Sequence, residues 1–67
     1  MNVIVYSSTG CPQCNVLKTR LSQKGIQYEV CDDIDEMERL GIKSIPVLSV
    51  DGRLMNFPEA FKYVNER

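Results

Sequence analysis

Two cysteines that are separated by two residues, Cys11 and Cys14 in "STGCPQC", are the pair most able to do chemistry in this sequence. Such a pair can exchange a disulfide as a redox couple, supply half of a metal site, or form a structural cross-link. A third cysteine, Cys31, makes the total odd, which is atypical of the disulfide frameworks of secreted domains. The sequence has no histidine, so imidazole catalysis is excluded, and a zinc site would need carboxylates or another chain to complete it.

The sequence around this pair predicts a strand that leads directly into a helix. Segment 2–7, "NVIVYS", is rich in β-branched and aromatic residues, which indicates a buried strand, and from Cys11 onward apolar residues recur at helical spacing. A helix that begins here places Cys11 at the N-cap and Pro12 at the first helical position, where a missing N–H costs nothing. The backbone N–H groups of Gln13 and Cys14 can then point at the Cys11 sulfur.

This placement would make Cys11 reactive. Backbone N–H groups and the positive end of a helix dipole can lower a cysteine pKa from about 8.5 into a range of roughly 3.5 to 7.5. Cys14 lies one turn further along the same side, at a Cβ separation of about 5 to 6 Å in a regular helix, whereas a disulfide needs roughly 3.5 to 4.5 Å. The non-helical backbone of an N-cap allows that closure. Cys11 would therefore attack a substrate disulfide, and Cys14 would resolve the mixed disulfide.

The remaining sequence predicts an α/β fold with the element order β-α-β-α-β-β-α. After a first helix that stops at Gly25, we expect a strand over 26–31, a short acidic helix over 32–41, a strand over 45–50, a turn at 51–52, a strand over 53–57 and a helix from Pro58. The strand-helix-strand unit predicts a parallel crossover, and the hairpin adds an antiparallel pair. We therefore expect one domain over 1–67, a small four-stranded mixed sheet with three flanking helices.

Composition and charge narrow the function classes. The chain is 43% apolar and 25% charged, which is typical of soluble globular domains. Its apolar runs are too short to span a bilayer and its first residues lack the basic region of a signal peptide, so we expect a cytoplasmic protein without membrane contact. Lys and Arg are scattered singly and the net charge is -1, which argues against nucleic-acid binding. The acidic run 32–38 indicates a solvated helix start, or alternatively a docking surface for a basic partner.

The segment "KSIPVL" supplies a second feature of interest. Proline is confined to the first residue of a strand or to an edge strand, and Pro46 precedes a predicted strand. A cis Ile45–Pro46 bond would present the backbone of Ile45 to an extended substrate chain beside Cys11. An ordinary proline at a strand start is the alternative.

An N-terminal strand, the motif C-P-x-C, "SIP" some thirty residues later and a D-G hairpin together resemble the glutaredoxin branch of the thioredoxin fold, including the small NrdH-type redoxins. The resemblance covers nearly the whole chain. It implies a thioredoxin fold and a cytosolic dithiol electron carrier that uses no cofactor, with a disulfide-bearing protein as substrate, ribonucleotide reductase foremost. The implied catalytic residues are Cys11 and Cys14, the implied substrate-binding residues are Gly10, Pro12, Gln13, Ser44, Ile45 and Pro46, and no metal ligand is implied.

The sequence departs from the glutaredoxin pattern at its glutathione-binding positions. "YSSTGC" lacks the usual Lys or Arg before the first cysteine, Gln13 replaces the usual tyrosine, and "MNFPEA" replaces a Gly-Gly segment followed by a helix-capping Asp. The aromatic-rich C-terminal signature of NrdH-type proteins is also missing. The reductant is therefore either thioredoxin reductase or glutathione, and we expect a monomer. The alternatives are a glutathione-dependent glutaredoxin and a non-catalytic metal-binding or adaptor module.

Overall fold

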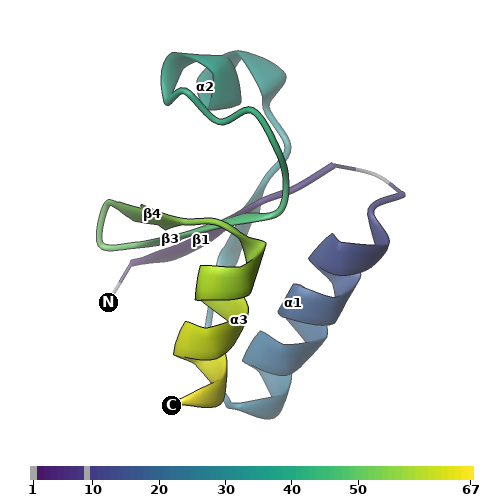
Figure 1. The fold of residues 1–67 in the computed structure, drawn as a ribbon, viewed down its shortest axis with the longest axis vertical. Coiled ribbons are helices and arrows are strands. Elements are labelled where there is room, and N and C mark those ends of the chain that lie inside the picture. Colours follow the sequence, from purple (N-terminus) through teal and green to yellow (C-terminus); the bar gives the residue numbers. More distant parts are fainter. Residues whose placement is uncertain (1, 9) are drawn as a thin grey trace.

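The computed structural model describes residues 2–8 and 10–67, and its elements follow the predicted order (Figure 1). The elements are β1 (Val3–Tyr6), α1 (Pro12–Gln23), β2 (Glu29–Cys31), α2 (Ile34–Arg39), β3 (Val47–Val50), β4 (Arg53–Met55) and α3 (Phe57–Asn65). None of the helices in the described part of the chain is both long enough and apolar enough to cross a membrane.

The four strands form one mixed sheet, as the sequence predicted, and the structure gives their order in it as β2-β1-β3-β4. β1 runs parallel to β2 and antiparallel to β3, and β3 and β4 form the predicted hairpin. Asp51 and Gly52 form its turn with φ angles of 51° and 90°, the positive values that a two-residue hairpin turn requires. The central position of β1 brings the segment that follows it to the middle of the sheet edge.

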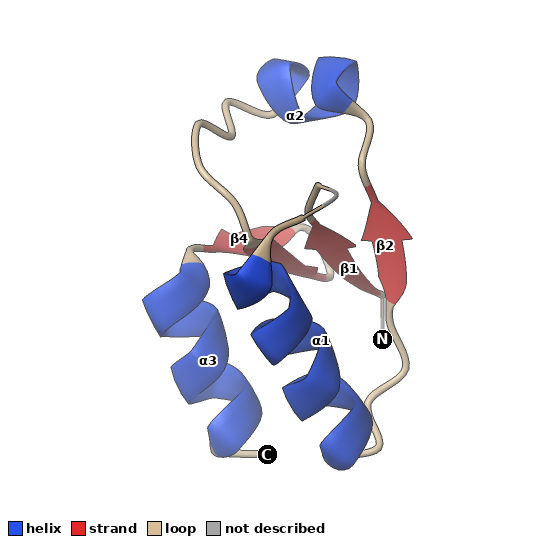
Figure 2. Cartoon of the chain, turned by 90° about the vertical axis from the view of Figure 1, so that its right-hand side faces the viewer, coloured by secondary structure: helices blue, strands red, loops and turns tan. Residues whose placement is uncertain are grey.

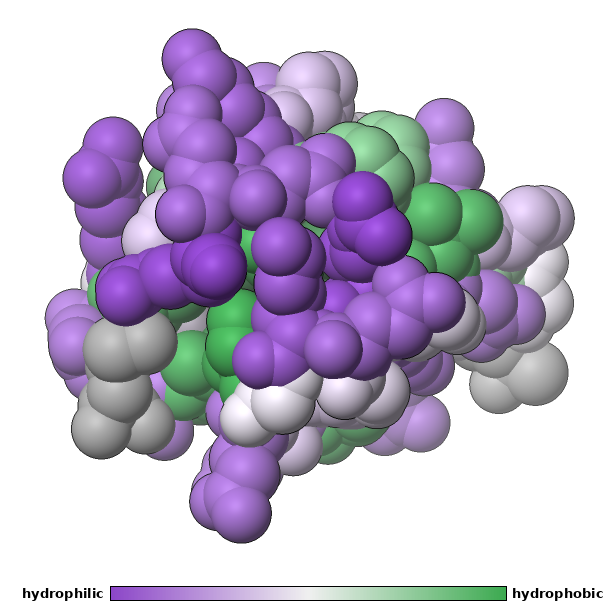
Figure 3. Space-filling model, turned by 90° about the horizontal axis from the view of Figure 1, so that it is seen from below, coloured by the Kyte–Doolittle hydropathy of each residue, from purple (hydrophilic) through white to green (hydrophobic). Residues whose placement is uncertain are grey.

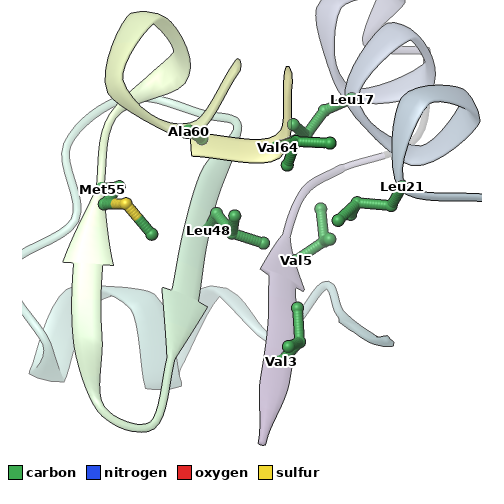
Figure 4. Close-up of a cluster of buried hydrophobic side chains, with 8 residues drawn as sticks. All are labelled: Val3, Val5, Leu17, Leu21, Leu48, Met55, Ala60 and Val64. Atoms are coloured by element: carbon green, nitrogen blue, oxygen red, sulfur yellow. The ribbon is translucent and has the colours of Figure 1, made fainter. Parts of the chain in front are cut away.

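The two faces of the sheet pack against different helices, because alternate side chains of a strand point to opposite sides. The face that carries Val5 and Leu48 packs against α1 and α3 and forms the main core (Figure 4). The buried residues of this core are Val3, Val5, Leu17, Leu21, Leu48, Met55, Ala60 and Val64. On the opposite face, Tyr6 and Val47 pack against Met37. Met37 belongs to α2, which lies on the other side of the sheet from α1 and α3 (Figure 2).

The second strand is shorter than predicted, because the end of α1 takes up part of the expected range. Gly25, with φ 71°, donates its N–H to the Ser22 carbonyl, and Ile26 donates to the Leu21 carbonyl at 3.0 Å. These two bonds form a Schellman motif, which satisfies carbonyls that the helix end leaves unpaired. β2 therefore begins at Glu29 rather than at residue 26.

The other boundaries also differ slightly from the prediction. β4 ends at Met55 instead of continuing through residue 57, because Asn56 is the N-cap of α3 and Phe57 is its first residue. The last helix consequently begins one residue before Pro58, which occupies its second position. β3 begins at Val47, directly after the Ile45–Pro46 bond.

Candidate functional site

The start of α1 has the geometry that the sequence predicted. Cys11 is the N-cap with extended backbone angles (φ -96°, ψ 106°), and Pro12 is the first helical residue. The backbone N–H of Cys14 donates a hydrogen bond to the Cys11 Sγ, with an N···S distance of 3.1 Å. A backbone donor of the first helical turn thus points at the Cys11 sulfur, where it would stabilise a negative charge on a thiolate.

Cys11 and Cys14 are joined by a disulfide bond. Their Cα atoms are 5.2 Å apart, which lies within the usual range for a disulfide. The Cys14 side chain is fully buried, whereas Cys11 is only partly buried. Of the two sulfurs, that of Cys11 is therefore the one that a second molecule can approach.

The strand register brings the proline segment to the same edge of the sheet as the cysteine segment. Tyr6, the last residue of β1, pairs with Cys31 at the end of β2 and with Val47 at the start of β3. The Ser7 N–H extends this pairing with a 3.0 Å hydrogen bond to the Cys31 carbonyl. The segments after β1 and β2 and the segment before β3, which ends with Pro46, therefore all lie at one end of the molecule.

The residues proposed from sequence to bind substrate fall into two groups by burial. The Ile45–Pro46 peptide bond is cis, as predicted, and Pro46 is buried while Ile45 is partly buried. The exposed members of the set are Gly10, Pro12, Gln13 and Ser44. The exposed residues flank the disulfide on the α1 side and precede the buried proline on the β3 side.

A sequence profile described as Glutaredoxin matches residues 3–55, which include most of this fold and the whole of the cysteine and proline segments. The chain belongs to the glutaredoxin family. This agrees with the resemblance seen in the C-P-x-C and "SIP" motifs.

One curated relative and two solved structures are similar to this glutaredoxin-family chain. It is 29% identical over 58 residues to N-acetyl-S-hydroxy-L-cysteine reductase of Bacillus subtilis, a match that covers 75% of this chain and 61% of that protein. The chain thus spans about three-fifths of the length of this curated relative. The crystal structure of a thioredoxin-like protein matches with a TM-score of 0.76 and 24% identity, covering 97% of this chain and 95% of the other. A Brucella melitensis glutaredoxin matches with a TM-score of 0.75 and 23% identity, covering 98% and 80%.

The structure identifies a capping residue that the sequence comparison with glutaredoxins overlooked. Asn56 is the N-cap of α3, and its side-chain oxygen accepts a hydrogen bond from the Glu59 N–H at 3.0 Å. The pattern of Asn followed three residues later by Glu is a helix-start signal, and it could have located this cap. The "MNFPEA" segment therefore lacks the Gly-Gly pair of a glutaredoxin but retains a helix cap.

A buried tyrosine lies at the same end of the sheet, beneath α2. Burial raises the pKa of Tyr6 above its ordinary value of 10.0, and the nearby Cys31 and Glu36 raise the pKa further while Arg39 opposes them. Arg39 and Glu36 form an ion pair on α2. Cys31 is a partly buried free thiol that packs in the cluster around Tyr6 and Met37. Sequence reasoning did not connect these residues, because only the fold brings α2 over the ends of β1 and β2.

The acidic segment forms the helix start that its sequence predicted. Asp33 is the N-cap of α2, and its Oδ1 accepts hydrogen bonds from the N–H groups of Asp35 and Glu36 at 3.0 and 3.3 Å.

Among residues 2–8 and 10–67, no three side chains of Cys, Asp or Glu are grouped as a metal site would need.

Proposed function

We propose that this glutaredoxin-family protein is a thiol-disulfide oxidoreductase that carries electrons through the Cys11/Cys14 couple. One observation carries the proposal: the more accessible sulfur, that of Cys11, accepts a hydrogen bond from the Cys14 N–H at a helix N-terminus, while the Cys14 sulfur is buried behind it. A reactive thiol that meets solvent and a resolving thiol that does not are the two parts that disulfide exchange requires.

The reduction of a substrate disulfide follows from this arrangement. In the dithiol form, the Cys11 thiolate attacks one sulfur of the substrate disulfide, a mixed disulfide forms, and the other substrate sulfur leaves as a thiolate. Cys14 then gives up its proton and attacks the Cys11 sulfur. The Cys11–Cys14 disulfide forms, and the second substrate thiolate leaves. Two electrons pass to the substrate, two protons convert its thiolates to thiols, and the protein is left in its disulfide form.

The exposed residues around the disulfide are the proposed substrate contacts. Gly10, Pro12 and Gln13 precede or begin α1, and Ser44 stands before the Ile45–Pro46 pair at the same end of the sheet. We assign these residues to binding of the chain that carries the substrate disulfide. Cys11 and Cys14 remain the proposed catalytic residues.

The proposed substrate is a disulfide-bearing protein of a reducing compartment such as the cytoplasm, with ribonucleotide reductase the leading candidate. The absence of a Lys or Arg in "YSSTG" and the presence of Gln13 both disfavour a glutathione site. We therefore favour thioredoxin reductase as the electron donor. Glutathione is the alternative donor.

NADPH consumption by the disulfide form tests this proposal, once with thioredoxin reductase and once with glutathione plus glutathione reductase. We expect turnover with thioredoxin reductase, loss of turnover in Cys11→Ser, and unchanged turnover in the matched control Cys31→Ser. Turnover with glutathione alone would make the protein a glutathione-dependent glutaredoxin. Turnover with neither donor, together with stoichiometric zinc in the purified protein, would replace the redox proposal with a metal-binding module.

The relative from Bacillus subtilis favours a second candidate substrate class, the sulfenic acid of a small cysteine derivative. Here the Cys11 thiolate would attack the sulfenic sulfur and form a mixed disulfide, while the hydroxyl group leaves and takes up a proton to become water. Cys14 would then release the reduced small thiol. The test is thioredoxin reductase-coupled NADPH consumption with the sulfenic acid of N-acetylcysteine generated in the assay. A rate no greater than without the small molecule would reject this candidate.

A further inference from the structure

The helices α1 and α3, which cover the main core, run side by side (Figure 2). Residues of α1 and one residue of α3 line a groove of about 430 Å³. It is lined by Asn15, Val16, Thr19, Arg20, Gln23 and Phe61. Asn15 is the lining residue nearest to the start of α1, one helical turn after Cys11, and its N–H donates to the Cys11 carbonyl at 3.2 Å. A chain that occupies the groove therefore comes within one helical turn of Cys11.

Apolar surface is available in this groove. Val16 is 48% exposed although it is a large apolar residue, and Phe61 is only partly buried. Single exposed apolar residues are common on protein surfaces, but these two line one hollow from two different helices. The hollow can therefore accept an apolar side chain.

Arg20 is the one charged residue that lines the groove, and its guanidinium group is held in place by neutral partners. Its Nε donates to the Asn65 side chain, its Nη1 donates to the Gln23 side chain at 3.1 Å, and the group lies 5.9 Å from the centre of the Phe61 ring. Within residues 2–8 and 10–67, the ion pair found joins Arg39 and Glu36, so no carboxylate of these residues pairs with Arg20. A guanidinium has five N–H donors, and donors remain for a carboxylate.

We propose that this groove binds an extended segment of the protein whose disulfide is exchanged, and that the segment is both apolar and acidic. An apolar side chain of the partner packs on Val16 and Phe61, and a carboxylate of the partner pairs with Arg20. The proposal rests on the proposed redox function, because the segment lies beside the disulfide that Cys11 attacks.

The length of the groove selects a polypeptide over a small thiol compound. Arg20 lies nine positions after Cys11, which corresponds to about 13 Å along the helix axis. An extended chain needs about four residues to span this distance. The γ-linked glutamate carries the farther carboxylate of glutathione, about three residue lengths or roughly 10 Å from its sulfur, so a glutathione sulfur at Cys11 leaves both carboxylates short of Arg20. Derivatives of a single cysteine are shorter still.

Two disulfide-containing peptides test the proposal. In both peptides, a leucine lies two residues from each cysteine of the disulfide. Four residues from each cysteine, the first peptide has an aspartate and the second has an asparagine. We expect the dithiol form of the protein to reduce the aspartate peptide about two- to fivefold faster at low salt, since a carboxylate–guanidinium pair at a partly exposed site contributes that much. The preference should shrink in high salt, because ions screen such a pair.

The variant Arg20→Gln should remove the preference, and the matched control Lys62→Gln should keep it. Lys62 is a cation of α3, the helix beside α1, but it lines a different hollow together with Arg53 and Glu59. The ratio of two rates from one protein sample does not depend on the fraction that is folded. Equal rates for the two peptides with wild-type protein would overturn the groove proposal and leave the redox function standing. Reduction of neither peptide would overturn the proposed function itself.

Discussion

The reactivity of Cys11 offers the most direct test of the site's chemistry, in a pair of variants that each retain one thiol of the couple. Cys14→Ser combined with Cys31→Ser leaves Cys11 as the single cysteine. Because the hydrogen bond to its sulfur comes from the backbone N–H of residue 14, the serine substitution leaves this donor in place. The partner variant, Cys11→Ser combined with Cys31→Ser, leaves the buried Cys14.

The size of the effect follows from the two interactions that favour a Cys11 thiolate. A hydrogen bond to a charged acceptor contributes about 1.5–3 kcal/mol, and a helix N-terminus contributes about 0.3–1 kcal/mol toward an anion. Together, about 2–4 kcal/mol correspond to a thiolate population about 30- to 1000-fold above that of an ordinary thiol. A stabilised thiolate is also less nucleophilic, and a Brønsted coefficient of about 0.5 reduces the net rate gain to about 5- to 30-fold.

The assay is alkylation by iodoacetamide at pH 5, with a short unstructured peptide that contains one cysteine as the reference. We expect the Cys11 thiol to react about 5- to 30-fold faster than the peptide and the Cys14 thiol to react more slowly than the peptide, because its side chain is fully buried. Equal rates for Cys11 and the peptide would refute the argument that the helix start activates this sulfur. A faster Cys14 than Cys11 would reverse the proposed roles.

Two further predictions concern stability. The variant Asn56→Ala, which removes the helix cap, should lower the free energy of unfolding by about 1 kcal/mol and Tm by about 4–8 °C, whereas Asn56→Asp should retain most of the stability. A thermal melt of each variant measures this. Equal Tm values for the wild type and the alanine variant would contradict the capping role. Burial raises the pKa of Tyr6 above 10.0, so its contribution to stability is complete below pH 10 and is lost as the pH rises through the folded-state pKa. In denaturant titrations above pH 10, the wild-type protein should therefore lose more stability than the Tyr6→Phe variant does. Equal losses in the two proteins would exclude this role for Tyr6.

Much of the site could be predicted from the sequence because it depends on neighbouring residues. The helix start at Cys11 follows from a strand-like segment, a cysteine able to act as an N-cap, and a proline at the first helical position. The mixed sheet follows from the short strand-helix-strand unit and the D-G turn. These are local signals, and the structure agrees with them.

The features that the sequence did not reveal depend on contacts between distant residues or on competing local signals. Arg20 meets Asn65 across the interface of α1 and α3, and nothing in the spacing of these two residues announces the contact. The range 53–57 was predicted as one strand because it follows the D-G hairpin turn, yet the capping preference of Asn56 ended the strand at Met55. A local cap outweighed a strand pattern of only five residues.

The end of the molecule that lies opposite the disulfide is covered mainly by hydrophilic side chains (Figure 3). The C-terminal ends of α1 and α3 lie there, and Lys24 donates a hydrogen bond to the Asn65 carbonyl at 3.3 Å. Contacts with a partner protein are therefore expected at the disulfide end and along the groove, which exposes Val16 beside Arg20.

The short outer strands of the sheet have a consequence for the behaviour of the protein in a crowded cell. β2 and β4 are the edge strands, each is three residues long, and they begin with the charged residues Glu29 and Arg53. Long, flat, apolar edges invite other chains to add as strands and start aggregation, and short, charged edges discourage it. The folded sheet thus exposes little backbone on which other chains could polymerise.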